Sequence, residues 1–213
     1  KIGAIREFHF GIIEALFEEP TFLKSDVQEL LNQVSAGIER TDLSYGEAYD
    51  YIVHHGELIS TKIIAAYVGK ATPTVWQDTR LLVRTDDQFR RATVRWEETT
   101  QAIQKRIDLG KVNIVQGFIG ATVSGIPTTL GREGSDYTGA VFAFCLGADS
   151  LTIWKDVPGM LNADPKTFQN TTKIDRLPFN EAIELAFYGA SIIHPKTIQP
   201  LKKKGIPLHI KSF

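Results

Sequence analysis

The order of hydrophobic patterns is the most restrictive feature of this chain, because strand-like and helix-like segments alternate from residue 72 onward. Short apolar or β-branched runs predict strands at 72–77, at 112–118, up to 128–130, at 150–154 and at 206–210. Apolar residues at three-to-four spacing predict helices at 93–109, at 136–146, at 180–189 and from Pro195. This alternation is typical of an α/β fold with a mostly parallel sheet.

Residues 1–69 have a different pattern, in which apolar side chains keep helical spacing throughout. We predict a first helix that ends before Pro20, and a later one that begins at Ser44, where Glu47 can complete a capping box. That later helix is expected to break near Gly56. The chain is therefore predicted as one continuous domain with a mainly helical part, 1–69, followed by an α/β part, 70–213.

Helix-end residues in the last third of the chain give more detailed expectations. Asn180 is predicted to cap a helix that closes at Gly189. Pro195 suits the first turn of the final helix, and Pro200 is expected to kink or divide that helix, because proline has no amide proton. Gly205 is predicted to end it.

Composition excludes several classes of protein. Among the 213 residues, 43% are hydrophobic and 23% charged, as in an ordinary globular protein. Lys plus Arg is 24 and Asp plus Glu is 25, so the net charge of −1 predicts no nucleic-acid partner and no anionic membrane. The single cysteine, Cys145, cannot form an internal disulfide, and no apolar run is long enough to span a bilayer. We expect a cytoplasmic protein. Because the sequence begins at Lys1 without a methionine, we interpret it as part of a longer chain.

The segment from Thr128 to Tyr137 is the strongest candidate for chemistry. A predicted strand runs through two glycines into a helix, and free amides at the start of a helix attract anions. Arg132 offers a planar fork for a carboxylate or phosphate, while Ser135 with Asp136 is predicted to cap the helix. A tight turn with an ordinary cap is the alternative. Asp136 would repel a bound phosphate unless a lysine or Mg²⁺ lay between them.

Two further segments carry candidate residues. Lys155, Asp156 and Lys166 follow a predicted strand, where open α/β sheets bind ligands, so the lysines could face nucleotide phosphates; ordinary turns are the alternative. Glu57 follows two histidines at a predicted helix start, where it would either neutralise the helix dipole or bind a substrate ammonium. The histidines are adjacent, without the helical spacing of metal ligands, so we assign no metal.

Taken together, these segments resemble the aspartokinases of the amino-acid kinase superfamily. The resemblance rests on seven segments, at 55–60, 84–86, 116–120, 128–136, 154–159, 163–165 and 187–195. It implies a three-layer αβα sandwich around a mostly parallel sheet. It also implies transfer of the γ-phosphate of ATP, with Mg²⁺, to the side-chain carboxylate of L-aspartate, on the route to lysine, threonine and methionine. The parent protein is expected to be a homo-oligomer.

The matching motifs imply a role for each candidate residue. Glu57 corresponds to the group that binds the substrate ammonium, Arg132 to the partner of the α-carboxylate, and Ser135 assists through the helix start. Asp136 is similar to the catalytic aspartate of the family, which is expected to orient a lysine near the phosphates. Lys155, Asp156 and Lys166 fall where the family holds the nucleotide.

The sequence also departs from the family pattern. Glu133 stands where a small residue is usual, Leu161 where tyrosine is common, and Ser191 where lysine is common. An opening strand with a catalytic lysine and two regulatory (ACT) domains are not among these residues, so we expect residues 1–213 alone to turn over poorly or not at all. Alternatives are a kinase for glutamate, acetylglutamate or a nucleoside monophosphate, a non-catalytic amino-acid sensor, and a purely structural domain.

Overall fold

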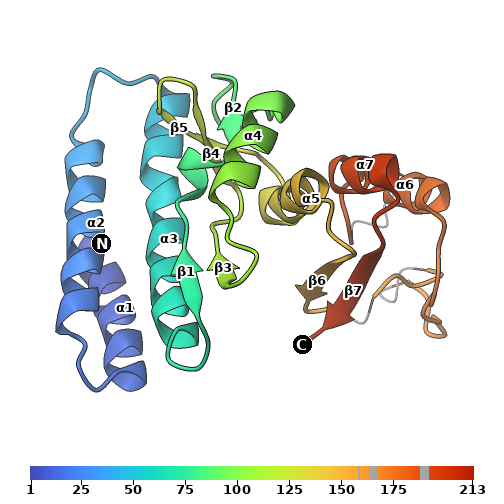
Figure 1. The fold of residues 1–213 in the computed structure, drawn as a ribbon, viewed down its shortest axis with the longest axis horizontal. Coiled ribbons are helices and arrows are strands. Elements are labelled where there is room, and N and C mark those ends of the chain that lie inside the picture. The colour runs from blue at the N-terminus through green and yellow to red at the C-terminus, as the bar shows by residue number, and fades with distance from the viewer. Residues whose placement is uncertain (158, 164–166, 188–191) are drawn as a thin grey trace. The chain divides into compact units, whose positions relative to one another are not determined.

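The computed structural model describes residues 1–157, 159–163, 167–187 and 192–213 (Figure 1). These residues form two compact units, Lys1–Arg132 and Glu133–Phe213. The division falls inside the glycine-containing turn, and not at residue 69, where the helical sequence pattern ends. Lys166, residues 164–165 and residues 188–191 belong to predicted motifs but lie outside the described residues.

The first unit opens with three helices, α1 (Ile2–Leu16), α2 (Thr21–Ile38) and α3 (Tyr45–Val68). Helix α3 begins as predicted, because the Ser44 hydroxyl accepts from the Glu47 amide at 3.3 Å and the Glu47 carboxylate accepts from the Ser44 amide at 3.0 Å. The predicted break near Gly56 is wrong: α3 is continuous from Tyr45 to Val68. Apolar packing on both sides of Gly56 outweighs the weak helix propensity of one glycine.

Apolar side chains from the three helices form the main core of the first unit. The buried members are Ile13 of α1, the α2 residues Val27, Leu30 and Leu31, the α3 residues Leu58, Ile59 and Ile63, and Ile119 from a strand. Their helical spacing places each set on one face of its helix, which explains why the sequence pattern predicted these helices.

Short strands complete the first unit beside α3 (Figure 1). They are β1 (Thr74–Trp76), β2 (Arg84–Thr85), β3 (Val112–Ile114), β4 (Ile119–Thr122) and β5 (Pro127–Thr129). Strand β1 pairs with β3 in parallel, β2 pairs with β4 in parallel, and β4 pairs with β5 antiparallel. A short 3₁₀ helix, η1 (Thr79–Leu81), and helix α4 (Trp96–Arg106) connect them.

The strand predicted at 112–118 is shorter than expected. Strand β3 ends at Ile114, and Phe118 adopts a left-handed φ of 71° before β4 begins at Ile119. A left-handed residue cannot continue a strand, so the apolar run is divided between two sheets.

In its described residues, the second unit contains a parallel pair of strands and three helices. They are α5 (Gly134–Leu146), β6 (Leu151–Lys155), α6 (Phe179–Phe187), α7 (Pro195–Lys204) and β7 (Leu208–Ser212). Leu151 pairs with Leu208 and Lys155 with Ser212, so the two strands end together. Ile153 of β6 packs with Ile193 and with Ile198 of α7. Among the described residues, three of the four strand pairings are parallel, so the predicted α/β class is confirmed.

The helix ends of the second unit differ in part from the predictions. Pro195 is the first residue of α7, and Gly205 ends it with a φ of 66°, as expected. Pro200 does not divide this helix. Asn180 is not a cap, because α6 already begins at Phe179. Within the described ranges, we find no helix that combines the length and the apolar character needed to cross a bilayer.

Candidate active site

Glu57 lies in the middle of helix α3, not at a helix start as predicted. The next two residues, Leu58 and Ile59, belong to the core, and Glu57 itself is half-buried. Burial raises the pKa of the Glu57 carboxyl above its ordinary value. In the described part of the chain, this carboxylate has no hydrogen bond or ion pair. A half-buried carboxylate without a counter-charge is suited to a cationic ligand.

The two histidines before Glu57 are held by their own helix. His54 Nδ1 lies 3.0 Å from the Asp50 carbonyl oxygen, and His55 Nδ1 lies 2.8 Å from that of Tyr51. Because a carbonyl accepts, each Nδ1 donates, and His54 Nε2 is left to accept from Arg80 Nη1 at 3.0 Å. Burial, with smaller effects from His55 and Arg80, lowers the pKa of His54 to about 3. Both side chains are thus built into the fold.

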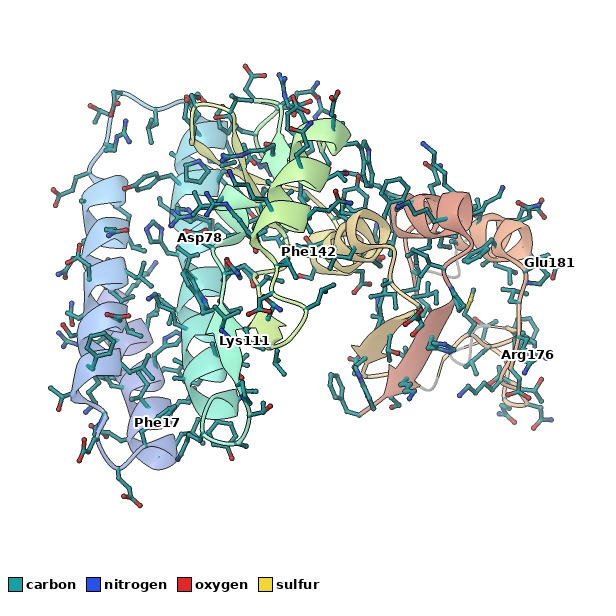
Figure 2. All side chains as sticks on the ribbon, in the orientation of Figure 1. Phe17, Asp78, Lys111, Phe142, Arg176 and Glu181 are labelled. Atoms are coloured by element: carbon teal, nitrogen blue, oxygen red, sulfur yellow. The ribbon has the colours of Figure 1, made fainter. Side chains whose placement is uncertain are left out.

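Arg80 forms the other side of that histidine contact, and it pairs in turn with Asp78, which is labelled in Figure 2. Arg80 Nη2 donates to Asp78 Oδ2 at 2.6 Å, and Asp78 also caps the 3₁₀ helix by accepting from the Arg80 amide at 3.0 Å. The guanidinium is therefore positively charged and paired, and it favours a neutral His54.

The turn between β5 and α5 depends on one glycine. Gly131 has a φ of 77°, and a Cβ added there would lie 3.1 Å from the Arg90 carbonyl oxygen. Only glycine fits this conformation and this approach without strain. The next residue, Arg132, is exposed. In the described residues, Arg132 forms no ion pair, with Glu57 or with any other carboxylate.

The predicted cap of helix α5 is wrong. Glu133 occupies the N-cap position in a left-handed conformation, with a φ of 54°, and in the described part of the chain this position has no side-chain capping hydrogen bond. Ser135 and Asp136 lie inside the first turn, and Ser135 is exposed. The first amides of the helix therefore have no intrahelical acceptor, which leaves them available to an anion.

Asp136 and Lys155 are two predicted site residues that the structure brings together. Lys155 Nζ lies 2.8 Å from Asp136 Oδ2, and the two side chains are only 20% and 17% exposed, respectively. The same ammonium donates to the Ile192 carbonyl oxygen at 2.5 Å. The negative charge of Asp136 thus has the cation that sequence reasoning required. Asp156, the next residue along the chain, is exposed.

A cavity of about 710 Å³ lies within the second unit. Apolar side chains such as Phe179 and Ile198 contribute to its wall together with the basic groups of Lys173, Arg176 and Lys211. Figure 2 labels Arg176 in the segment that precedes α6. Apolar walls with a few charged groups are typical of small-molecule sites, and a nucleotide offers both an apolar base and charged phosphates.

A buried polar network in the first unit was not predicted from the sequence. Gln116 is fully buried, accepts from the Thr79 amide at 2.7 Å and donates to Thr61 Oγ1 at 2.8 Å. Asp50 is also fully buried and binds Thr129 of β5. The only signal in the sequence was a polar residue at an apolar position, Asp50 in a helical pattern and Gln116 in the strand predicted at 112–118, and neither pattern identifies the partner.

The chain belongs to the amino acid kinase family, whose profile matches residues 18–212. Two relatives that cover all of this chain are aspartokinases. The chain is 37% identical over 218 residues to lysine-sensitive aspartokinase 3 of Escherichia coli, covering 100% of this chain and 48% of that protein. It is 33% identical over 220 residues to the chloroplastic aspartokinase 1 of Arabidopsis thaliana, covering 100% of this chain and 38% of that protein. The resemblance inferred from the motifs is confirmed.

Solved structures give the same result. Escherichia coli aspartokinase III in complex with aspartate and ADP superimposes with a TM-score of 0.91 at 34% identity, over 99% of this chain and 48% of that one. Clostridium acetobutylicum aspartate kinase superimposes with a TM-score of 0.77 at 26% identity, over 99% of this chain and 44% of that one. The predicted amino-acid kinase fold is therefore confirmed, and this chain spans about half the length of these relatives or less.

Proposed function

We propose that the protein containing this chain transfers the γ-phosphate of ATP to the side-chain carboxylate of L-aspartate, giving 4-phospho-L-aspartate. The observation that carries this proposal is the Asp136–Lys155 ion pair of 2.8 Å, in a chain that superimposes over 99% of its length on an aspartokinase with aspartate and ADP bound. The product would enter the synthesis of lysine, threonine and methionine. We also propose, from the family resemblance, a cytoplasmic homo-oligomer.

The acceptor needs no general base in this reaction. An aspartate side chain has an ordinary pKa of about 3.9, so it is already ionised at neutral pH. Catalysis then consists of placing two anions in line and neutralising the charge that develops on the transferred group. Cations held at fixed positions supply most of that effect.

Each candidate residue has one task in this proposal. Glu57 binds the ammonium of aspartate and Arg132 binds its α-carboxylate, since each is a charge with no partner among the described residues. Ser135 contributes through the open start of α5. Asp136 holds Lys155 toward the phosphates.

Nucleotide binding is assigned to the second unit. Lys155 is the last residue of β6, and Asp156 and Lys166 come after it in the sequence, at the carboxyl end of a strand, where α/β folds bind ligands. The 710 Å³ cavity adds an apolar and basic wall that suits an adenine nucleotide.

Mg²⁺ fits the site only as an ion that arrives with ATP. In the described residues, no group of three or more His, Cys, Asp or Glu side chains could hold a metal. Protein-bound Mg²⁺ commonly keeps several waters and is coordinated by substrate phosphates with one or two carboxylates. The ion would neutralise charge on the phosphates, while this chain supplies the lysine beside them.

The test is a kinase assay on the whole protein with hydroxylamine trapping of the acyl phosphate, run with aspartate, glutamate and N-acetylglutamate as acceptors. We expect trapped product with aspartate. A product with glutamate or N-acetylglutamate alone would overturn the choice of substrate. Nucleotide binding by calorimetry without any product would instead indicate a sensor.

A variant of Arg132, compared with a control variant of an exposed arginine, tests the binding of the α-carboxylate. Arg132→Ala removes a charged hydrogen-bond partner of the substrate, a loss of about 2–4 kcal/mol that should be seen mainly as a higher KM for aspartate. The control is Arg106→Ala, because Arg106 is an exposed arginine in the last turn of α4. If both variants keep the KM of the wild type, the assigned role of Arg132 is wrong.

A further inference from the structure

Asp50 holds a fully buried carboxylate that neither the motifs nor the proposed reaction uses. Its Oδ2 accepts from the Arg90 amide at 2.9 Å and from the Thr129 amide at 2.9 Å. Its Oδ1 accepts from the Thr129 hydroxyl at 2.7 Å. In the described residues, no cation pairs with this carboxylate. Three neutral donors therefore compensate the cost of burying the charge.

These three hydrogen bonds connect two segments that carry proposed substrate ligands. Asp50 precedes Glu57 on helix α3 by about two turns. Thr129 is the last residue of β5 and leads through Gly131 to Arg132. The carbonyl oxygen of Arg90 itself lies close to Gly131. All of these residues lie within the first unit.

The geometry of β5 explains why a side chain is needed here. Thr129 pairs with Ile119 of β4 on one side, and its carbonyl accepts from the Ala92 amide at 2.9 Å. The Thr129 amide points instead to α3, where Asp50 takes the place of a strand partner. The same carboxylate accepts from Arg90, a residue with a left-handed φ of 68°. Without it, two main-chain donors would lack this acceptor.

We infer that Asp50 is a positioning residue for the acceptor amino acid, because it fixes the helix of Glu57 against the turn of Arg132. This inference rests on the proposed function. Glu57 would bind the ammonium and Arg132 the α-carboxylate of one small molecule, so their separation must match that molecule closely. A displacement of about 1 Å at such a site can change a rate by roughly 100-fold.

The inference predicts which kinetic constant changes. Asp50→Ala should raise the KM for aspartate by roughly tenfold or more. The KM for ATP should change by less than about twofold, because Asp136 and Lys155 belong to the other unit. The loss of a merely structural residue would reduce stability without raising the KM for aspartate selectively over the KM for ATP.

Asp50→Asn is the conservative variant that should restore function. Its amide oxygen can accept from both main-chain amides, and its NH₂ group can donate to the Thr129 hydroxyl, which then accepts. We expect a KM for aspartate within about threefold of the wild type, because Asp50 acts by fixing the positions of Glu57 and Arg132 and not through its own charge. If Asp50→Ala does not fold, Asp50→Glu replaces it, since one added methylene shifts the same donors.

A stability control completes the experiment. Ile103→Ala creates a cavity at a fully buried residue of α4 in the first unit, outside the core cluster that contains Leu58 and Ile59 beside Glu57, and should lower the unfolding midpoint while leaving both KM values unchanged. The positioning role is overturned if Asp50→Ala, or Asp50→Glu in its place, keeps the KM for aspartate of the wild type. It is also overturned if Ile103→Ala raises that KM equally.

Failure of the proposed function has a different signature. In that case the wild-type protein neither phosphorylates aspartate nor binds it by calorimetry, whichever residue occupies position 50. The structural part of the inference then still has its own readout, because Asp50→Ala should speed hydrogen exchange at the Thr129 and Arg90 amides while Asp50→Asn should not.

Discussion

Lys155 at the end of β6 and Asp136 in the first turn of α5 form an ion pair of 2.8 Å, and both side chains are more than three-quarters buried. The lysine is fixed a second time by the Ile192 carbonyl. A lysine side chain has four rotatable bonds, so these two contacts cost conformational freedom. A cation held in advance at one position can stabilise the charge that develops in a transition state, which offsets this loss of freedom.

We predict that this pair is coupled in stability and indispensable for turnover. Asp136→Asn and Lys155→Met should each destabilise the fold by about 1–3 kcal/mol, because each leaves the other charge buried without its partner. The double variant should be more stable than the sum of the two losses implies. Urea unfolding of the four proteins measures the coupling, and kcat should be low in all three variants.

The exposed Arg95–Glu98 pair is the control for this cycle. Its atoms are 3.5 Å apart and its side chains are 50% and 47% exposed, so Glu98→Gln should change stability and kcat little. Normal turnover by Asp136→Asn would remove Asp136 from the catalytic residues.

Replacing Glu57 by glutamine should stabilise the fold at neutral pH but weaken the binding of aspartate. Burial raises its pKa, so between the ordinary and the raised value the unfolded chain is ionised while the folded chain holds the proton. The folded state then binds more protons, and stability falls as pH rises through that window. Glu57→Gln should therefore be more stable than the wild type at neutral pH, and the difference should vanish below about pH 4.

The same variant should bind aspartate less well. Replacing the carboxylate removes a charged partner of the substrate ammonium, a loss of about 2–4 kcal/mol. Denaturant unfolding at several pH values and the KM for aspartate measure the two effects. Lower stability of the glutamine variant at neutral pH would contradict the assigned cost of burial.

Local chemistry explains which parts of the fold could be predicted. The Ser44 capping box, Pro195 at a helix start and Gly205 at a helix end were all correct, because neighbouring residues decide them. The predicted break at Gly56 was wrong, because packing against other segments decides whether a glycine interrupts a helix. The strand expected at 112–118 was too long, because the left-handed conformation of Phe118 divides the apolar run between two sheets.

In the candidate site, too, the features that depend on residue type could be predicted, whereas contacts between distant segments could not. The motif around Arg132 and the need of Asp136 for a cation could be predicted from residue types. The identity of that cation as Lys155 depends on β6 lying beside α5, and the contact of Asp50 with Thr129 joins α3 to β5. Contacts between segments far apart in sequence leave no periodic pattern in either segment.

His54 should make stability sensitive to acid. Its pKa is lowered to about 3, mainly by burial, with contributions from His55 and Arg80. An ordinary histidine has a pKa of about 6.5. Below that pH the unfolded chain gains a proton that the folded chain refuses, so stability is lost as pH falls from about 6.5 toward 3, by an amount on the order of 3–5 kcal/mol.

His54→Gln should reduce this slope, because glutamine does not titrate. Asp78 lies beside Arg80 and keeps the guanidinium paired in both proteins. His209→Gln, at an exposed position of β7, is the matched control. Urea unfolding between pH 7 and 4 is the measurement, and parallel pH profiles for wild type and His54→Gln would show that His54 does not cause the loss.

Substituting Gly56 tests whether glycine is needed at this position for folding or for substrate binding. It is exposed in the middle of α3, and in the described chain no atom outside its own helix segment lies within 4 Å of where a Cβ would stand. Glycine inside an exposed helix costs about 1 kcal/mol relative to alanine, so Gly56→Ala should stabilise the protein by about that amount. The fold alone therefore gives no reason for glycine beside Glu57.

A substrate gives a reason, because an ammonium bound at Glu57 needs close approach to the surface of α3. Gly56→Ala should therefore raise the KM for aspartate several-fold while it raises the unfolding midpoint. Gly11→Ala is the matched control: Gly11 is also exposed inside a helix, α1, with no atom within 4 Å of its Cβ position among the described residues. It should give the same gain of about 1 kcal/mol with an unchanged KM. Equal KM values for the two variants would place the acceptor away from α3, and Glu57 would then lose its assigned role.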